Sequence, residues 1–245
     1  MDRIREAADI IAKGKHVVAF TGAGISVESG IPPFRGKTGL WSKYDPGILD
    51  LSMYFYRPGE SWPVIYELFY QFFGEARPNP AHFFLAKLEN ANKLSAVITQ
   101  NIDNLHQEAG SKEVIEYHGN SRRLVCLECG RTYASDDLNL NKDLPLCEHD
   151  HAVLKPDFVF FGESIPEQAV IRSTEEAGKA DVMIVIGTTG EVMPASLIPR
   201  MASNNGATII EINPEETVYT ESITNIFLQG EAGEVCTKLA NEMNI

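Results

Sequence analysis

Short apolar runs alternate along this chain with segments in which apolar residues recur at helical spacing. The apolar runs predict buried strands at residues 16–20, 94–98, 114–117, 182–186 and 208–212. The periodic segments predict a first helix that ends near Gly14, then helices at residues 81–89, 167–178, 194–204 and 231–243. Continuous apolar strands separated by helices are typical of a parallel sheet that is covered on both faces. We therefore predict an α/β fold with a Rossmann-like parallel sheet.

Two stretches depart from this rhythm. Residues 37–80 are rich in aromatic side chains and prolines, and residues 120–157 carry most of the cysteines. We predict that both are inserts, in which the chain leaves the sheet and later returns to it. The first stretch is expected to be a helical insert, and the second an insert resembling a zinc ribbon. We expect a single domain, residues 1–245, in which these two inserts form a smaller lobe. The large lobe then comprises residues 1–36, 81–119 and 158–245.

Composition and charge narrow the classes of function. With 44% hydrophobic and 22% charged residues, the 245-residue chain is typical of a globular protein. Its net charge of -13, from 34 acidic and 21 basic residues, argues against binding to nucleic acid and is compatible with lysine-rich partners. No apolar run approaches the roughly 18 residues of a membrane span, and the charged N-terminus is unlike a signal peptide. We therefore expect a cytoplasmic protein that does not act at a membrane.

The first predicted strand leads directly into Gly22-Ala23-Gly24. Glycines at such a turn let the backbone approach a phosphate group, and a following helix start offers free N–H donors. A turn without any ligand is the alternative, because the pattern departs from G-x-G-x-x-G at Val27. Glu28 also lies too close to be the distant ribose-binding acid of a dehydrogenase, which disfavours hydride transfer.

Polar residues follow the next two predicted strands. Gln100, Asn101 and Asp103 come after the second strand, and His118 comes after the third. An amide pair, a carboxylate and an imidazole at strand ends suit chemistry on a bound nucleotide better than they suit a core. Asn and Asp at these positions are also favoured as helix caps, and capping is compatible with catalysis.

A stiff loop over residues 30–36 presents Phe34 and Arg35. Arginine suits a phosphate or ribose contact, and the phenylalanine ring would cover a flat ring of a ligand. The alternative is a surface loop that is anchored by a buried phenylalanine.

Short motifs follow one another in order over nearly the whole chain. They are Gly22-Ala23-Gly24-Ile25-Ser26, Gly30-Ile31-Pro32-Pro33-Phe34-Arg35-Gly36, Thr99-Gln100-Asn101-Ile102-Asp103, Leu105-His106, His118-Gly119, Phe161-Gly162-Glu163, Gly187-Thr188-Thr189, Ile212-Asn213-Pro214 and Gly230-Glu231-Ala232-Gly233-Glu234. Together they resemble the signature of the sirtuins, which are NAD-dependent protein lysine deacylases.

This resemblance implies a specific reaction. The acyl oxygen of an acylated lysine attacks the anomeric carbon of the nicotinamide ribose of NAD, nicotinamide leaves, and the acyl group passes to ADP-ribose. His118 is then the general base, a role that suits imidazole because its ordinary pKa lies near neutrality. Asn101 would orient ribose or water, and Asp103 would accept a hydrogen bond from the nicotinamide carboxamide.

The resemblance also assigns the residues that hold NAD: Gly22, Ala23, Gly24, Phe34, Arg35, Gln100, Asn101, Ile102, Asp103, Gly187, Thr188, Thr189, Asn213 and Ala232. An acylated peptide would lie as an added strand between two segments, Val159-Phe160-Phe161-Gly162 and Glu191-Val192. Two positions depart from the family pattern, since Thr189 stands for the usual serine and Gly190 replaces a bulkier residue. Gly190 puts the packing beside the peptide in doubt, though not the binding of NAD.

The segment after Trp62 bears on the acyl group. Family members that prefer succinyl or malonyl lysine carry a Tyr and an Arg three residues apart after a Trp. The matching positions here are Ile65 and Leu68, and no Lys or Arg occurs over residues 63–76. An acidic acyl chain would lack a cation, and an unpaired buried carboxylate is costly. We therefore predict a neutral acyl group, either acetyl or a longer apolar chain.

Three cysteines fit three-quarters of a structural zinc site: Cys126, Cys129 and Cys147. The family pattern contains a second Cys-x-x-Cys pair, and counting places Asp150 at the fourth position. Either neighbour, His149 or His151, is an alternative ligand. Two further outcomes stay open: a degenerate module that holds zinc weakly or not at all, and a Cys126–Cys129 disulfide, which a reducing compartment disfavours.

Rival functions share part of this chemistry or none of it. Mono-ADP-ribosyl transfer cleaves the same bond of NAD with a protein nucleophile as acceptor. A non-catalytic module that senses NAD or ADP-ribose is opposed by His118, Asn101 and Asp103. A nucleic-acid-binding zinc ribbon is opposed by the net charge, although Arg122 and Arg123 form a small basic spot.

Overall fold

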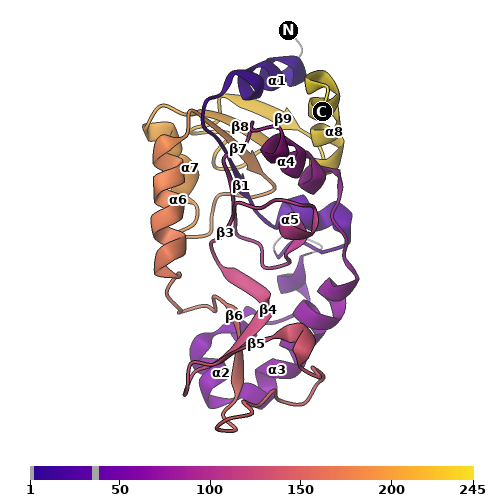
Figure 1. Ribbon diagram of the computed structural model, residues 1–245, viewed down its shortest axis with the longest axis vertical. Helices are drawn as coiled ribbons and strands as arrows, with labels where there is room; N and C mark the ends of the chain where they lie inside the picture. Colours follow the sequence, from indigo (N-terminus) through magenta and orange to yellow (C-terminus); the bar gives the residue numbers. More distant parts are fainter. Residues whose placement is uncertain (1–2, 35–38) are drawn as a thin grey trace.

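The computed structural model describes residues 3–34 and 39–245. Its main feature is a six-stranded sheet with the strand order β3-β2-β1-β7-β8-β9, in which every pair is parallel (Figure 1). The strands are β1 (Val17–Thr21), β2 (Ala96–Thr99), β3 (Val114–Glu116), β7 (Val182–Ile186), β8 (Thr208–Asn213) and β9 (Ile226–Gln229). The order reverses at β1, as in doubly wound nucleotide-binding sheets. The prediction of an α/β, Rossmann-like sheet is confirmed.

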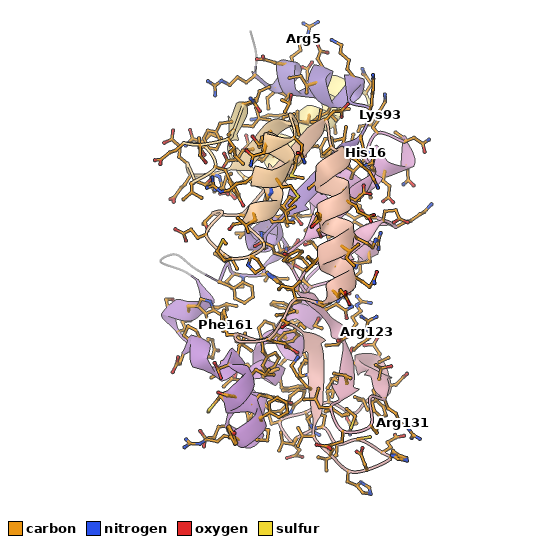
Figure 2. All side chains as sticks on the ribbon, turned by 90° about the vertical axis from the view of Figure 1, so that its left-hand side faces the viewer. Arg5, His16, Lys93, Arg123, Arg131 and Phe161 are labelled. Carbon is orange, nitrogen blue, oxygen red and sulfur yellow. The ribbon has the colours of Figure 1, made fainter. Side chains whose placement is uncertain are left out.

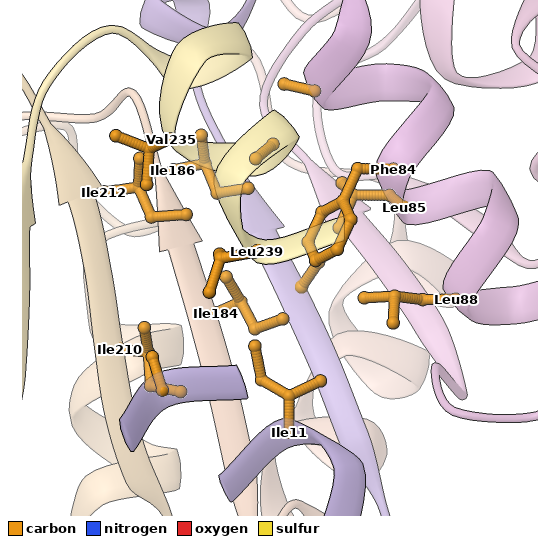
Figure 3. Close-up of a cluster of buried hydrophobic side chains, with 14 of the residues drawn as sticks. Ile11, Phe84, Leu85, Leu88, Ile184, Ile186, Ile210, Ile212, Val235 and Leu239 are labelled. Atoms are coloured by element: carbon orange, nitrogen blue, oxygen red, sulfur yellow. The ribbon is translucent and has the colours of Figure 1, made fainter. Parts of the chain in front are cut away.

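Helices cover both faces of this sheet, as Figure 1 shows. One face is packed by α1 (Arg3–Lys13), α4 (Pro80–Asn90) and α8 (Ala232–Met243), and the other by α6 (Glu167–Lys179) and α7 (Leu197–Asn204). Strand β7 shows why both faces are apolar. Ile184 and Ile186 join the cluster under α4 and α8 (Figure 3), whereas Met183 and Val185 join the cluster under α6 and α7.

Local sequence fixes where α4 begins. Asn79 precedes the helix and its side-chain oxygen accepts a hydrogen bond from Ala81 N at 2.9 Å. His82 Nδ1 accepts the Asn79 N–H at 3.3 Å, so the two side chains form a reciprocal capping box. Pro80 occupies the first helical position, where its missing N–H costs nothing.

A second, antiparallel sheet lies at the other end of the molecule, with the order β5-β4-β6 (Figure 1). Its strands are β4 (Gly119–Cys126), β5 (Thr132–Ala134) and β6 (Leu154–Phe158). The helices α2 (Leu51–Tyr56) and α3 (Pro58–Tyr66) pack there against an aromatic core that includes Trp62, Phe69 and Phe158. Division of the chain into two lobes at the boundaries given above stays a prediction.

Shorter helical pieces complete the chain. They are a four-residue α5 (Leu105–Glu108), a π-helix (Glu67–Phe72), and 3₁₀-helices at Ala23–Ser29, Leu40–Ser42, Pro46–Leu49, Phe73–Glu75 and Ser135–Asp137. Across residues 3–34 and 39–245, no helix combines the length and apolarity needed to cross a membrane.

Candidate active site

The glycine turn after β1 packs against the end of β7. Gly24 N donates to the Gly187 carbonyl oxygen at 2.8 Å, and Gly22 N donates to Ile186 O at 3.0 Å. A Cβ on Gly24 would lie 2.6 Å from Gly187 Cα, and Gly187 itself has a φ of +65°. Glycine is thus required here because the two backbones approach each other closely. A 3₁₀-helix, Ala23–Ser29, follows the turn in place of a regular α-helix start.

The ends of three strands meet beside this turn. Gln100 follows β2, and its side-chain Nε2 donates to Thr188 Oγ1 after β7 at 3.1 Å. A Cβ on Gly22 would lie 2.8 Å from Thr188 Cβ and 3.1 Å from Gln100 Nε2. Five residues assigned to NAD by resemblance therefore converge at the switch point of the sheet: Gly22, Gly24, Gln100, Gly187 and Thr188. Their small side chains, hydroxyl and amide suit a phosphate or ribose.

Asn101 and Asp103 are joined through Ser26. Asn101 Nδ2 donates to Gly22 O and to Ser26 Oγ, both at 3.2 Å, and Ser26 Oγ donates to Asp103 Oδ2 at 2.7 Å. Asp103 Oδ1 also accepts the Leu105 N–H at 3.0 Å, so the expected capping role coexists with the site. Burial raises the pKa of Asp103, and the hydrogen bonds from Leu105 and Ser26 oppose that rise.

Ser26 lies in the sirtuin-like motif, but the sequence assigns it no role. Its side chain is fully buried, and it links Asn101 to Asp103. No local signal in the sequence marks this link. Ile102, between the two, is buried, and its carbonyl accepts both the N–H and the hydroxyl of Ser121. This leaves Ile102 as a backbone anchor of the turn.

His118 stands between the two sheets, after β3 and before β4. Its Nδ1 lies 3.0 Å from the carbonyl oxygen of Gln100. A carbonyl only accepts, so this contact places the proton on Nδ1 and leaves the Nε2 lone pair for another proton. Burial lowers the pKa of His118, and the Gln100 carbonyl partly opposes that effect. A neutral imidazole with an unprotonated Nε2 is the state that a general base requires.

A buried polar chain supports the β1 and β2 ends. His106 Nε2 lies 2.9 Å from Thr21 Oγ1, which donates to Thr99 Oγ1 at 2.9 Å. Thr99 Oγ1 in turn accepts the Asn101 N–H at 3.0 Å. The His82 ring packs on His106 with 4.9 Å between centroids. Burial lowers the pKa of His82 to about 4, and it also lowers that of His106 well below its ordinary value, so both rings are neutral at pH 7.

Asn213 and Ala232 lie on the β8–β9 side of the same sheet edge. Asn213 ends β8, and its Nδ2 donates to Glu215 O at 2.9 Å. Ala232 begins α8 and is buried. The Gly233 N–H donates to the carboxylate of Glu28. Glu28 therefore caps α8, where a negative charge is favourable, rather than serving a ribose.

Phe34 packs within an aromatic group. Its ring centroid lies 5.4 Å from Trp41 and 6.3 Å from Phe69. Phe34 is half-buried, which agrees with an anchored loop. Arg35, its predicted partner in the site, lies outside the described residues.

One segment assigned to the peptide is fixed along one edge. Phe161 N donates to Leu49 O at 2.8 Å, and Leu51 N donates to Phe161 O at 3.0 Å. Phe161 is 50% exposed (Figure 2), whereas the Phe160 side chain is buried at 1%. Val159 N donates to the His118 carbonyl oxygen at 2.8 Å. Phe160 is therefore a core residue, whose ring is not available to a peptide.

A shallow pocket adjoins this segment. It has a volume of about 530 Å³, and its lining is largely apolar and aromatic: Leu51, Phe55, Tyr56, Phe161 and Gly162, with Asp50 and Ser52. Gly162 has a φ of +83°, which turns the chain sharply at the pocket wall.

The second peptide segment follows β7. Thr189 Oγ1 lies 3.4 Å from the exposed Glu191 carboxylate, and Val192 O accepts the Ser196 N–H at 2.8 Å. Gly190 has a φ of +75°, and a Cβ there would lie 2.8 Å from the Tyr219 ring. The Tyr219 ring therefore occupies the space that a side chain at position 190 would need.

One group of side chains in the described parts of the chain is arranged to hold a metal ion: Cys126, Cys129, Cys147 and Asp150. Their ligand atoms all lie within 4.8 Å of one another. The Cys129 and Cys147 sulfurs are 3.7 Å apart, and Asp150 oxygens lie 3.4 Å from Cys126 Sγ. In a tetrahedral zinc site with Zn–S near 2.3 Å, neighbouring ligand atoms are separated by roughly 3.6–3.8 Å. The donor set and spacing therefore fit zinc.

The other metal alternatives fare differently. His149 and His151 are exposed, and neither belongs to this cluster. Both Cys126 and Cys129 are free thiols, so the disfavoured disulfide alternative is not formed. The Tyr133 hydroxyl lies 3.2 Å from Cys147 Sγ, and Ala152 N donates to Asp150 Oδ1 at 3.0 Å, which orients both candidate ligands.

Comparisons with known proteins agree with this arrangement. The sequence model of the Sir2 family matches residues 22–194. An NAD-dependent protein deacylase of Pyrococcus abyssi is 44% identical over 245 residues, covering 98% of each chain. One of the same name from Pyrococcus furiosus is 46% identical over 243 residues, covering 97% of each chain.

Solved structures of Sir2 enzymes share the fold. One, described as "Structural Basis for the Mechanism and Regulation of Sir2 Enzymes", superposes with a TM-score of 0.91 at 42% identity, covering 99% of this chain and 98% of the other. Another, described as "Sir2-p53 peptide-NAD+", gives a TM-score of 0.90 at 34% identity and covers 98% of each chain. The resemblance to sirtuins that the motifs carry is thereby confirmed, and the chain belongs to the Sir2 family.

Proposed function

We propose that this protein is an NAD-dependent protein lysine deacylase that passes a neutral acyl group to ADP-ribose and releases nicotinamide. The observation that carries the proposal is the contact between His118 Nδ1 and the Gln100 carbonyl. It leaves an unprotonated Nε2 at the edge where the strand ends meet. The deacylase names of the Pyrococcus relatives and the NAD and peptide in the Sir2 complex support the same reading.

In this proposal each group at the strand ends has one task. His118 takes a proton from a ribose hydroxyl, which a neutral imidazole does efficiently near neutral pH. Asp103, oriented by Ser26 and the Leu105 N–H, accepts a hydrogen bond from the nicotinamide carboxamide. Asn101, held by Gly22 and Ser26, orients ribose or water. NAD supplies the electrophilic carbon and the leaving group.

The peptide is proposed to add as a strand between the segments at Phe161 and Val192. Leu49 and Leu51 already bond the Phe161 N–H and carbonyl along one edge, so a peptide would add along the other edge of this segment. Main-chain pairing tolerates varied side chains, so broad sequence preference is expected. The net charge of -13 favours peptides that carry further basic residues.

The neutral acyl preference rests on the segment after Trp62. Ile65 and Leu68, at the positions that matter by resemblance, are buried at 0% and 4% within the aromatic core. An apolar wall there offers a succinyl carboxylate no partner. Acetyl-, longer fatty-acyl- and succinyl-lysine versions of one peptide should be compared. Faster removal of succinyl than of acetyl would refute this preference.

The decisive test is incubation of the protein with NAD and an acetyl-lysine peptide. Mass spectrometry should show free lysine, nicotinamide and O-acetyl-ADP-ribose in equal amounts. His118→Ala should lose nearly all turnover, and His149→Ala, an exposed histidine, serves as the matched control. ADP-ribose attached to protein without deacetylation would instead support mono-ADP-ribosyl transfer. If the protein binds NAD but forms neither O-acetyl-ADP-ribose nor ADP-ribosylated protein, the result would support a non-catalytic sensor module.

Two further expectations accompany this function. Zinc is expected at Cys126, Cys129, Cys147 and Asp150 as a structural ion that closes the loop ends of the antiparallel sheet. A cytoplasmic location stays a prediction, which cell fractionation would test.

A further inference from the structure

The Lys155 side chain ends inside the aromatic core of the antiparallel sheet. Only 2% of the residue is exposed. Its Nζ donates to Pro156 O at 2.9 Å and to Phe158 O at 2.7 Å, and it lies 2.9 Å from Glu163 Oε2. An ammonium group has three N–H donors, so these acceptors use all of them. The lysine is therefore a fully satisfied buried cation that no step of the reaction employs.

The Glu163 carboxylate holds a turn at the same time. Its Oε2 accepts the Phe160 N–H at 2.8 Å, while Glu163 N donates to Phe160 O at 3.0 Å. The Lys155 ammonium lies 4.3 Å from the centroid of the Phe160 ring, within cation–π range. Phe161 and Gly162 form the exposed tip between these anchors. The turn is thus closed by one carboxylate and lies against one cation.

This cation is also tied to the backbone next to His118. Phe158, whose carbonyl accepts from Lys155, pairs with Gly119 in the β4–β6 ladder. The next residue, Val159, donates its N–H to His118 O at 2.8 Å. Lys155 therefore bonds to both sides of a junction, with the histidine backbone on one side and the exposed turn on the other.

Stability alone is a weak reason for such a pair. Removing two charges from water costs several kcal/mol, and well-packed apolar residues of similar volume are often as stable. A buried ion pair adds a fixed geometry, because three acceptors specify where the ammonium and the carboxylate lie.

We propose that Lys155 and Glu163 are positioning residues, which fix the Phe160–Glu163 turn relative to His118 and so set the affinity for the acylated peptide. The inference rests on the proposed function, and it concerns its peptide site alone. Neither side chain contacts the reacting atoms. The residues at the β1, β2 and β7 ends that are assigned to NAD hold one another through other contacts.

The test is steady-state kinetics of Lys155→Met, which removes the charge and the donors at similar length. Peptide KM should rise about tenfold, since small misplacements of a binding surface have effects of this size or larger. The KM for NAD should stay within about twofold of wild type, because loss of peptide binding alone does not change it. Arg172→Met is the matched control: it breaks the exposed ion pair between Arg172 of α6 and Glu113, which precedes β3, and both KM values should be unchanged.

Glu163→Gln and the double variant make the test specific to the pair. Glu163→Gln keeps one acceptor oxygen and should raise the peptide KM less than Lys155→Met does. If the two side chains act as a unit, the double variant should have the peptide KM of Lys155→Met rather than the product of both effects. If Lys155→Met does not fold, Glu163→Gln decides: an unchanged peptide KM overturns the inference.

The failures of the two proposals are distinct. A wild-type protein without NAD-dependent deacylation contradicts the proposed function. Wild-type turnover with a peptide KM in folded Lys155→Met within twofold of normal overturns the positioning role alone, and so does a variant that loses only thermal stability.

Discussion

The backbones of Gly24 and Gly187 touch: the Gly24 N–H donates to the Gly187 carbonyl at 2.8 Å, and no side chain separates them. This contact joins the first strand-to-helix turn to the end of β7, where the strand order of the sheet reverses. Ligands of doubly wound sheets bind at that point. The two glycines therefore let these two backbone segments meet where a dinucleotide crevice is expected.

Gly24→Ala should damage this crevice. The new Cβ would lie 2.6 Å from Gly187 Cα, so one backbone segment must move. We expect a loss of about 1–3 kcal/mol in the free energy of unfolding, as for overpacked cores, together with weaker binding of ADP-ribose. Urea unfolding and calorimetric titration measure the two effects. Gly59→Ala in α3 is the control, since its Cβ would meet nothing within 4 Å; equal behaviour of the two variants would contradict the close contact.

The pH profile of kcat/KM should report His118. Burial lowers the pKa of this imidazole below its ordinary value near 6.5, and a general base is active when it is unprotonated. Activity should therefore persist as the pH falls through 6.5 and decline only below it. The profile should be measured with peptide and NAD well below their KM values. An acid limb centred above pH 6.5 would contradict the assignment.

Two buried neutral histidines should make the fold sensitive to acid. Burial lowers the pKa of His82 to about 4. Between pH 6.5 and 4 the unfolded chain binds a proton there that the folded protein does not, so stability falls as the pH falls. The loss from this one group amounts to about 3 kcal/mol at most, and His106 acts in the same direction.

Urea unfolding at pH 7.0, 5.5 and 4.5 measures this dependence. His82→Gln should be less stable at pH 7, because its cap on Asn79 is altered, but should lose less stability on acidification. The exposed His149→Gln should keep the wild-type slope. Identical slopes in all three proteins would show that His82 titrates normally.

Zinc content tests the four-residue cluster. Protein prepared with zinc present should hold about one ion per chain. Asp150→Ala should release it to a chelator sooner, and Asp150→Cys should retain it longer, because a fourth thiolate is a softer ligand. Cys236→Ala, in the distant helix α8, should have no effect on metal content. Well under one zinc in wild type would show a degenerate module.

Strands with uninterrupted apolar sequence were predictable. β7 occupies residues 182–186 as expected, because every one of its residues is buried between two helical layers. β9 was missed, since it lies at the sheet edge, has only four residues and alternates buried with exposed positions. The predicted helix 194–204 begins three residues late, at Leu197, because residues 193–196 form turns, in which Leu197 N donates to Pro194 O at 3.0 Å.

The site was predictable as a set of residue types but not as a set of contacts. Polar residues at strand ends pointed to Gln100, Asn101, Asp103 and His118 because the carboxyl ends of parallel strands share an edge. Tertiary partners leave no local signal. The Glu28 cap on Gly233 joins opposite ends of the chain, and Lys155 gives no sign in sequence that it is buried.

Strand β4 connects the candidate active site to the cysteine cluster. β4 begins at Gly119, beside the imidazole, and ends at Cys126, the first thiol of the cluster. A reagent that strips or alkylates those sulfurs would loosen the far end of a single extended segment, roughly 20 Å or more away by the rise of a strand. Chemical attack on the thiols therefore reaches the imidazole only through the length of β4.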